Sequence, residues 1–217
     1  MSGIYLAAGL STRMKQPKLR LPLSPGAMLG SQALHALLNS AIKSWIVVHR
    51  SNDELEWLDT PELERACRAA QLHKQECPLS ARGMSRSLRS GLEALLTLYP
   101  HTDAVLIALA DQPFVTARMA VRLVEALEHN STLDYAAYSD GSATMPPALL
   151  RATMFSALEE LEGDQGARRL FASTGKYKGA VLDLNGEQDF ALHDIDDEDS
   201  LQAAIGFWNR RESDGHG

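Results

Sequence analysis

Residues 4–18 read Ile4-Tyr5-Leu6-Ala7-Ala8-Gly9-Leu10-Ser11-Thr12-Arg13-Met14-Lys15-Gln16-Pro17-Lys18, an apolar segment followed by a small-residue loop and several cations. Ile4–Leu6 predicts a short buried strand, because apolar and β-branched residues favour the interior of a sheet. Ala7–Gly9 removes side-chain bulk, so that backbone N–H groups can turn toward an anion. Arg13 and Lys18 offer charge to phosphate oxygens. The stretch therefore predicts a strand that ends in a phosphate-binding loop, and a surface turn with solvated cations is the alternative from these residues alone.

Charge is distributed unevenly along the chain. The first 52 residues contain no Asp or Glu, whereas the whole chain carries 28 acidic residues against 21 Lys and Arg, a net charge of -7. This balance argues against nucleic acid as a partner, because polyanion binding needs a broad cationic surface. The local positive field centres on Arg13, Lys15, Lys18 and Arg20, and residues 183–199 carry acids without any Lys or Arg. The two biases indicate a metal–phosphate site, although acidic clusters are also common on solvated surfaces.

Length and composition are typical of one globular domain. A chain of 217 residues with 45% hydrophobic content can form a single α/β domain, expected over residues 1–211, with a polar tail at 212–217. The sequence has no long apolar run and begins its first strand without a cationic leader, so we expect a cytoplasmic protein that does not insert in membranes. Cys67 and Cys77 lack the spacing of metal ligands.

Strand-like and helix-like segments alternate along the chain. This alternation predicts a three-layer α/β/α fold with a mainly parallel sheet. The expected strands are Ile4–Leu6, Trp45–His49, Asp103–Leu109, Tyr135–Tyr138, Ala180–Leu184 and Phe190–Ile195. The expected helices are Met28–Ala41, Glu54–Leu72, a segment around Leu88–Leu95, Ala117–Glu128, two segments that flank residues 163–166, and Asp197–Arg210.

Two carboxylates follow predicted strands. In open α/β sheets ligands bind beyond the carboxyl ends of the strands, where the 7–9 loop, Asp111 and either Asp194 or Asp196 would lie. Magnesium needs one or two protein carboxylates and fills its other positions with water and phosphate oxygens. Asp111 and Asp194 are therefore the candidate ligands, with a simple turn before Pro113 as the alternative for Asp111. Residues 196–199, all acidic, are expected to cap the last helix.

Two glycine-containing segments are predicted to enter helices. In residues 83–92, Ser85 is the expected N-cap, and helix N-termini favour anions. In residues 163–169, Asp164 is in a similar position, and Arg168 follows it. A simple cap with solvated arginines is the alternative in both cases.

Five segments together carry a family resemblance. They are Leu6-Ala7-Ala8-Gly9-x-Ser11-x-Arg13-Met14 with Pro17-Lys18, Gly83-x-Ser85-x-Ser87-Leu88-x-x-Gly91-Leu92, Leu109-Ala110-Asp111-Gln112-Pro113, Gly163-Asp164-x-Gly166-Ala167-Arg168 and Asp194-Ile195-Asp196. They resemble the nucleotidyltransferases of the nucleotide-diphospho-sugar transferase fold, a Rossmann-like architecture. Within that group they resemble the molybdenum cofactor cytidylyltransferase family, which includes proteins accessory to xanthine dehydrogenase.

The resemblance implies an activity. Members of this family transfer CMP from CTP to the phosphate of molybdopterin, with or without its molybdenum, and release pyrophosphate in a reaction that depends on Mg²⁺. The acceptor is a phosphate monoester, which is already anionic near neutral pH, so no strong general base is required. A transient molybdenum hydroxylase partner is also implied.

The resemblance implies three catalytic residues: Arg13 and Lys18 would bind the triphosphate, and Asp111 would bind the metal, with Asp194 completing the metal shell. The nucleotide would also contact Leu6, Ala7, Ala8 and Gly9 beside the base and phosphates, and Ser85 and Ser87 at the ribose or base. Asp164 and Arg168 would lie on the pterin side. Ala at position 8 accompanies cytidine in this family, whereas guanylyl-transferring relatives usually carry Gly there. Lys15, Arg20 and Met145 depart from the family pattern.

Two other functions remain open from the sequence. The first is a transferase that activates a sugar phosphate or another small phosphate with a nucleoside triphosphate (NTP). The second is a carrier that holds molybdenum cofactor without catalysis and delivers it to a hydroxylase.

Overall fold

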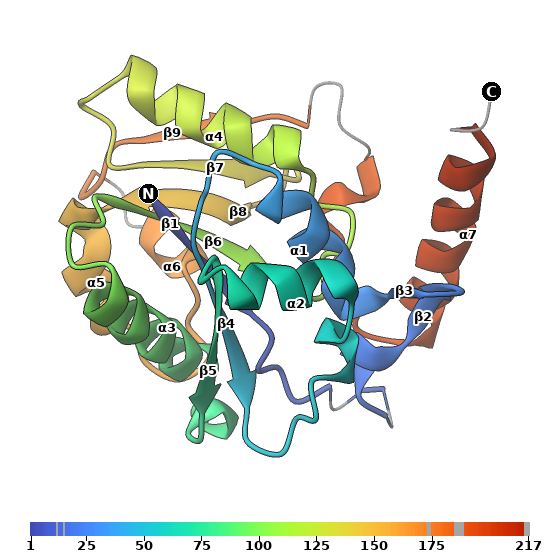
Figure 1. The fold of residues 1–217 in the computed structure, drawn as a ribbon. Coiled ribbons are helices and arrows are strands. Elements are labelled where there is room, and N and C mark those ends of the chain that lie inside the picture. Colours follow the sequence, from blue (N-terminus) through green and yellow to red (C-terminus); the bar gives the residue numbers. More distant parts are fainter. Residues whose placement is uncertain (12, 15, 173–174, 185–188, 215–217) are drawn as a thin grey trace.

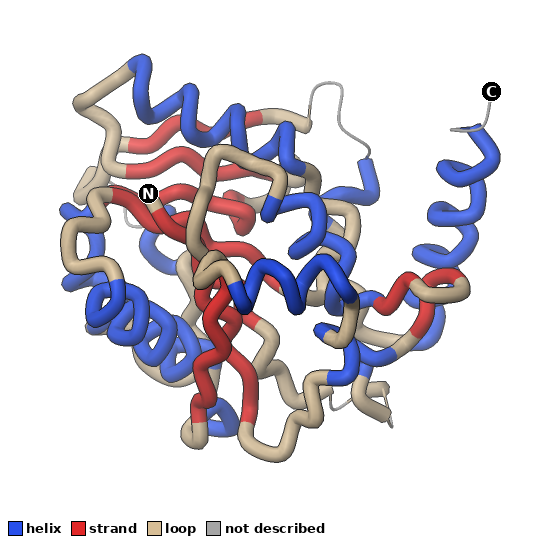
Figure 2. Tube along the Cα trace, in the orientation of Figure 1, coloured by secondary structure: helices blue, strands red, loops and turns tan. Residues whose placement is uncertain are grey.

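The centre of the protein is a sheet that is parallel except for one strand. A computed structural model describes residues 1–11, 13–14, 16–172, 175–184 and 189–214. Within this part of the chain the strand order is β5-β4-β1-β6-β8-β7-β9, and β8 runs against both of its neighbours (Figures 1 and 2). The strands are β1 (Ser2–Leu6), β4 (Trp45–Arg50), β5 (Leu72–Cys77), β6 (Ala104–Leu109), β7 (Tyr135–Ser139), β8 (Thr144–Arg151) and β9 (Gly179–Leu182).

Helices cover both faces of this sheet. One hydrophobic core lies between the sheet and α1 (Leu29–Leu38), α2 (Pro61–Arg68), α4 (Ala117–His129) and α7 (Glu198–Asp214). The other lies between the sheet and α3 (Met84–Leu98), α5 (Phe155–Glu159) and α6 (Arg168–Phe171). The predicted three-layer α/β/α fold with a mainly parallel sheet is confirmed.

Short elements connect these layers. A small hairpin of β2 (Pro22–Ser24) and β3 (Ala27–Met28) packs against α7, which projects from the body beside it (Figure 1). Single 3₁₀ turns are η1 (Lys18–Arg20), η2 (Glu56–Leu58), η3 (Ser80–Arg82), η4 (Ala152–Met154) and η5 (Asp189–Leu192). Helix α7 continues to Asp214, past the start of the tail expected at 212. No helix in the described residues combines the length and apolar character needed to cross a bilayer.

The central strands are apolar throughout because both of their faces are covered. In β1, Tyr5 faces the core of α1 and α2, whereas Ile4 and Leu6 face the core of α3, as the two-residue period of a strand requires. Helix α3 lies very close to this strand, since a Cβ at Gly91 would come within 2.8 Å of Ile4 Cγ2 and 2.7 Å of Val48 Cγ2. This packing holds the first turn of α3 near the carboxyl ends of β1 and β4.

The structure corrects three secondary-structure predictions. The helix expected over Glu54–Leu72 is divided: Thr60 caps a shorter α2 and Leu72 begins strand β5. Strand β8 was not predicted, and its two prolines lie where the register with β7 shifts, a position that tolerates proline. The strand expected over Phe190–Ile195 is wrong: residues 189–192 form η5, and Phe190 packs its ring against Phe114 instead of joining the sheet.

Candidate functional site

The loops that follow β1 and β6 meet at the same edge of the sheet. Ala7 N–H donates to Val48 O at 2.8 Å, and Ala110 N–H donates to Leu6 O at 3.0 Å, so both loops leave the sheet in fixed positions. Nothing in the described structure approaches within 4 Å of a Cβ built on Gly9. The backbone beside Gly9 is therefore open to a ligand.

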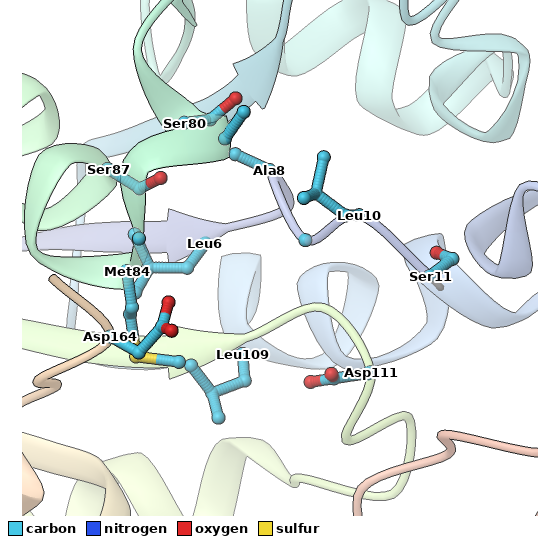
Figure 3. Close-up of a pocket in the computed structure, with 13 residues that line it drawn as sticks. Leu6, Ala8, Leu10, Ser11, Ser80, Met84, Ser87, Leu109, Asp111 and Asp164 are labelled. Carbon is cyan, nitrogen blue, oxygen red and sulfur yellow. The ribbon is translucent and has the colours of Figure 1, made fainter. Parts of the chain in front are cut away.

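A pocket of about 390 Å³ lies between the loop after β1 and the start of α3 (Figure 3). Its walls combine small or apolar side chains with a few polar ones, and they are formed by Leu6, Ala8, Gly9, Leu10, Ser11, Ser80, Ala81, Gly83, Met84, Ser87, Leu109, Asp111 and Asp164. We call it the first pocket. The structure thus brings Leu6, Ala8, Gly9, Ser87 and Asp111 together around one cavity, whereas Ala7 is buried in the core on the other face of the sheet.

Ser85 does not have the predicted position. Gly83 is the N-cap of α3, and Ser85 lies inside the helix, fully buried, with its backbone N–H donating to Gly163 O at 3.1 Å. Its Oγ has no hydrogen-bond partner among the described residues and does not line the first pocket. The predicted N-cap at Ser85 is therefore wrong.

A second pocket, of about 240 Å³, adjoins the first. Its lining combines apolar and charged side chains and consists of Met84, Leu109, Gln112, Met145, Pro146, Asp164, Gly166, Ala167, Arg168 and Asp194. Asp164 and Arg168 therefore share a cavity, and Met145 also lines it. The two pockets have Met84, Leu109 and Asp164 in common, so these residues lie where the pockets meet. Figure 3 shows the three side chains in the first pocket.

Close backbone packing holds these residues in place. Gly83 has a φ of +118°, and a Cβ there would come within 2.2 Å of the Gly163 carbonyl carbon, so position 83 requires glycine. A Cβ on Gly166 would come within 2.6 Å of Met84 Sδ, the end of a flexible side chain that could move aside. The backbone contact at Gly83 therefore docks the start of α3 onto residues 163–164.

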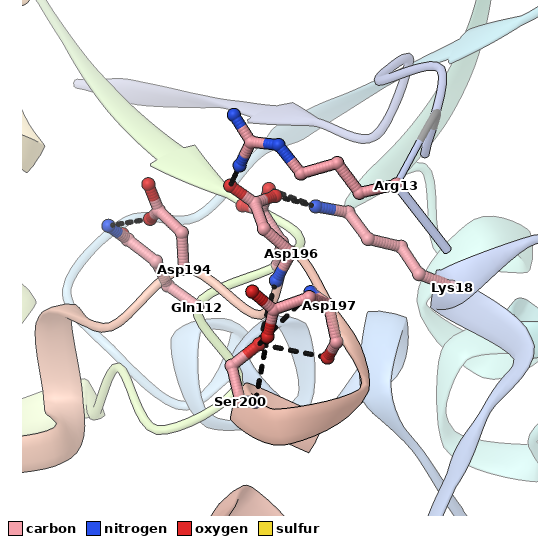
Figure 4. A network of polar contacts seen from close by, with 8 residues as sticks. Arg13, Lys18, Gln112, Asp194, Asp196, Asp197 and Ser200 are labelled. Atoms are coloured by element: carbon pink, nitrogen blue, oxygen red, sulfur yellow. Dashed lines mark hydrogen bonds and ion pairs between the residues drawn. The ribbon is translucent and has the colours of Figure 1, made fainter.

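A charge network lies beside the first pocket (Figure 4). Lys18 Nζ, from η1, lies 2.7 Å from Asp111 Oδ2 and 2.7 Å from Asp196 Oδ1, and Arg13 Nη1 lies 3.1 Å from Asp196 Oδ2. The Lys18 side chain is only 7% exposed, whereas that of Arg13 is 71% exposed. Burial alone would lower the pKa of Lys18, but the carboxylates of Asp111 and Asp196 outweigh it and raise that pKa above its usual value. Lys18 is therefore a fixed cation.

The other cations of the predicted positive field are not in this network. Arg20 turns toward the loop after β4, where Nη1 lies 2.9 Å from Glu54 Oε2 and 3.5 Å from Glu56 Oε2. Lys15 lies outside the described residues.

Hydrogen bonds hold the segment of Asp194 against the loop that carries Asp111. Gln112 Nε2 donates to Asp194 Oδ1 at 2.9 Å, and Ile195 N–H donates to the Asp111 backbone carbonyl at 2.9 Å. The surrounding protein partly shields Asp194 from water and, together with the negative charge of Asp111, raises the pKa of Asp194. The structure thus brings the two predicted metal ligands to the same edge of the sheet.

Asp196 is the site residue that the sequence prediction ranked too low. It was set aside in favour of Asp194 because it was expected to cap the last helix, but Asp197 has that role, since Ser200 N–H donates to Asp197 Oδ1 at 2.9 Å. Asp196 is instead the shared partner of Lys18 and Arg13. The repeat of an acid two residues after Asp194, outside the helix, was the available signal.

Fold and site together define a class. A parallel sheet with a small-residue loop after its first strand, a carboxylate after the strand beside it, and cations at the same edge is typical of the nucleotidyltransferases.

Comparison with known proteins gives the family and the relatives. Residues 3–179 match the MobA-like NTP transferase domain, and the chain therefore belongs to this family. It is 35% identical over 196 residues to the purine catabolism protein PucB of Bacillus subtilis (strain 168), covering 89% of this chain and 90% of that protein.

Solved structures with low sequence identity share the fold. The structure of Rv0371c from Mycobacterium tuberculosis H37Rv is 22% identical, with a TM-score of 0.72 over 95% of this chain and 98% of that one. A complex of Rv0371C with manganese has a TM-score of 0.64 at 22% identity, over 94% and 97%. The molybdopterin-guanine dinucleotide biosynthesis protein A of Archaeoglobus fulgidus is 15% identical, with a TM-score of 0.63 over 97% and 100%.

Proposed function

We propose that this protein transfers CMP from CTP to the phosphate of molybdopterin, with or without its molybdenum, and releases pyrophosphate. The observation that carries the proposal is the pair of adjoining pockets, with Asp111 on the wall of one and Asp194 on the wall of the other. Transfer between two substrates requires both to be bound with their reacting groups close together and aligned, which two adjoining pockets can provide.

The first pocket suits the nucleotide. In this proposal the base and ribose lie against Leu6, Ala8 and Ser87, and the phosphates lie along the open backbone at Gly9. Lys18 and Arg13 are at hand for the phosphate oxygens, Lys18 as a fixed charge and Arg13 as an exposed, adjustable one. Ala7 acts only through its backbone, since its side chain is buried.

The second pocket suits an acceptor with a ring body and a phosphate. Met145, Pro146 and Ala167 offer an apolar surface of the kind that a pterin can lie against. Arg168 offers a guanidinium that can bind an anionic group, and Asp164 offers an acceptor for ring N–H donors. A sugar phosphate would leave the apolar surface without a partner.

The carboxylates suit a divalent cation such as magnesium. Asp111 and Asp194 are oxygen ligands. Burial, and after it the negative charge of Asp111, raise the pKa of Asp194, and a bound cation would offset both effects. Magnesium needs only one or two protein carboxylates, because phosphate oxygens and water fill its other positions. When bound, magnesium neutralises charge on the phosphate oxygens.

The residues of the chain then have mainly electrostatic tasks. An oxygen of the acceptor phosphate attacks the α-phosphorus of CTP, a P–O–P bond forms, and the bond to the β-phosphate breaks to give pyrophosphate. Lys18 and Arg13 offset the charge of two anions that approach each other, and the pocket walls keep them in line. The acceptor is already ionised, so no proton has to be removed by the protein.

The relatives support this choice among NTP transferases. PucB is named for purine catabolism, and xanthine dehydrogenases, which oxidise purines, are molybdenum hydroxylases. The shared fold with a molybdopterin-guanine dinucleotide biosynthesis protein, and the manganese complex of Rv0371C, fit a metal-dependent transferase that acts on a pterin. A molybdenum hydroxylase is accordingly the proposed recipient of the product.

The test is transfer with defined substrates. The purified protein with Mg²⁺ is incubated with each NTP and either molybdopterin or a set of sugar phosphates, and pyrophosphate and the dinucleotide product are measured. We expect both products with CTP and molybdopterin. Activity only with a sugar phosphate would overturn the acceptor assignment, and molybdopterin binding without any pyrophosphate release would favour the carrier.

A further inference from the structure

The Asp196 carboxylate binds two cations at once. Its Oδ1 lies 2.7 Å from Lys18 Nζ, and its Oδ2 lies 3.1 Å from Arg13 Nη1 (Figure 4). These are the two side chains that the proposed function assigns to the triphosphate. Each oxygen of this carboxylate pairs with one cation, so Asp196 takes the place that phosphate oxygens would take at Lys18 and Arg13.

The position of Asp196 is fixed by its own segment. The Asp196 backbone N–H donates to Ser200 Oγ at 3.1 Å, and Ser200 belongs to the first turn of α7. On the other side, Ile195 N–H donates to the Asp111 carbonyl at 2.9 Å, and the Ile195 side chain is fully buried. The backbone of Asp196 is therefore held beside Lys18, whose own side chain is buried.

The charges at this edge do not favour a bare triphosphate. Three carboxylates (Asp111, Asp194 and Asp196) and two cations (Lys18 and Arg13) lie at this edge. Each cation already has a carboxylate partner, and Asp194 is bonded to Gln112. A triphosphate without a metal would have to displace Asp196 and remain beside the unneutralised Asp111 and Asp194. A triphosphate that carries a divalent cation brings the charge that these carboxylates lack.

We propose that Asp196 determines specificity at this site by competing with phosphate for Lys18 and Arg13, so that triphosphate binding depends on the accompanying metal. This inference rests on the proposed function, because it assumes that the polyphosphate binds at Lys18. Asp196 thereby weakens the binding of metal-free nucleotide, which would otherwise occupy the site without undergoing transfer.

The experiment compares two variants with the same change in net charge. Asp196→Asn removes the competing charge, and Asp199→Asn removes an exposed carboxylate from the first turn of α7, three residues away. Each protein is titrated calorimetrically with CTP in EDTA, and then with CTP in excess Mg²⁺. Thermal unfolding confirms that each variant is folded.

We expect metal-free CTP to bind Asp196→Asn about tenfold more tightly than wild type, as loss of one charged competitor predicts. Asp199→Asn should match wild type, and the Mg²⁺ dependence of CTP affinity should shrink only in Asp196→Asn. Equal metal-free affinity in all three proteins would overturn the inference. The inference would also be overturned if Asp196→Asn bound CTP more weakly than wild type in Mg²⁺ but equally well in EDTA, because that result would identify Asp196 as a metal ligand.

Pyrophosphate as a second probe separates this inference from the proposed function. It has the phosphates but no base, so tighter metal-free binding to Asp196→Asn would support the competition even if CTP proved to be the wrong nucleotide. If wild type with Mg²⁺ binds CTP and transfers CMP but the two variants do not differ, the proposed function stands and the role of Asp196 falls.

Discussion

Lys18 Nζ and Asp111 Oδ2 lie 2.7 Å apart although their residues are 93 positions apart in the sequence. The contact joins the loop region after β1 to the loop after β6, and it brings a fixed cation next to a candidate metal ligand. The two charges stabilise each other, so a substrate that separates them must supply a replacement for each. Phosphate oxygens would replace Asp111 beside Lys18, and a cation would replace Lys18 beside Asp111. This relationship makes both side chains testable.

Replacement of Asp111 by Asn should abolish transfer while the protein stays folded. The amide keeps the size of the side chain but loses the charge for a metal, and loss of one electrostatic contact of this kind costs on the order of 10²–10³ in rate. Lys18 retains Asp196 as a partner, so the fold should tolerate the change. Rates of pyrophosphate release and thermal unfolding are the measurements.

Asp103→Asn is the matched control for this variant. Asp103 lies at the opposite end of β6, is 67% exposed, and pairs with the amino terminus at 3.3 Å. Its loss should leave the transfer rate within about twofold of wild type, because surface ion pairs contribute little. Full activity in Asp111→Asn would remove this carboxylate from the mechanism, and full maturation of a molybdenum hydroxylase by an inactive Asp111→Asn would favour the carrier function.

Gly83→Ala should destabilise the protein more than Gly141→Ala. Both glycines have a positive φ, +118° and +89°, so both substitutions strain the backbone. Only at position 83 would the new Cβ meet another backbone, at 2.2 Å from Gly163, while nothing lies within 4 Å at position 141. We expect an additional loss of about 1–3 kcal/mol in the free energy of unfolding for Gly83→Ala, measured by urea denaturation. Equal losses would show that residues 163–166 yield easily.

Much of the site could be predicted from the sequence because its parts follow strands. The Ala7–Gly9 loop and Asp111 each come directly after an apolar strand, and parallel strands bring such positions to one edge. Ser85 was misplaced because serine is a common N-cap, whereas Gly83 serves here through its backbone and its contact with Gly163. That contact depends on residues far away in the chain.

The role of Asp196 could not be predicted from local pattern. In a run of four acids, each one is equally able to cap a helix, and only the folded chain shows that Asp197 is bonded to Ser200 while Asp196 faces Lys18. The two missed strands of the central sheet have different causes. Strand β5 is a polar edge strand, and β8 contains Pro146 and Pro147 at a register shift.

The turn between β7 and β8 should become less stable in acid. Hydrogen bonds from the Ser142 hydroxyl and from the backbone N–H groups of Ala143 and Ser142 lower the pKa of Asp140 from 3.8 to about 2. Because this pKa is lowered by folding, the stabilisation is complete above pH 3.8 and is lost as the pH falls toward 2. The difference in unfolding free energy between wild type and Asp140→Ala should therefore be constant near neutral pH and should decrease below about pH 4. A difference that does not change with pH would contradict the assignment.

Met84 should keep the two pockets separate during transfer. Its side chain is 39% exposed and lines both cavities, so Met84→Ala would join them and admit water beside the reacting phosphates. We expect hydrolysis of CTP without acceptor to rise several-fold relative to transfer, and the KM for the acceptor to rise, while Met84→Leu restores both values. Leu98→Ala is the control, because Leu98 is also exposed on α3 but lies at its other end and lines neither pocket. The same rise in hydrolysis in both alanine variants would assign it to a looser α3, and an unchanged ratio in Met84→Ala would show that Met84 does not govern the reaction.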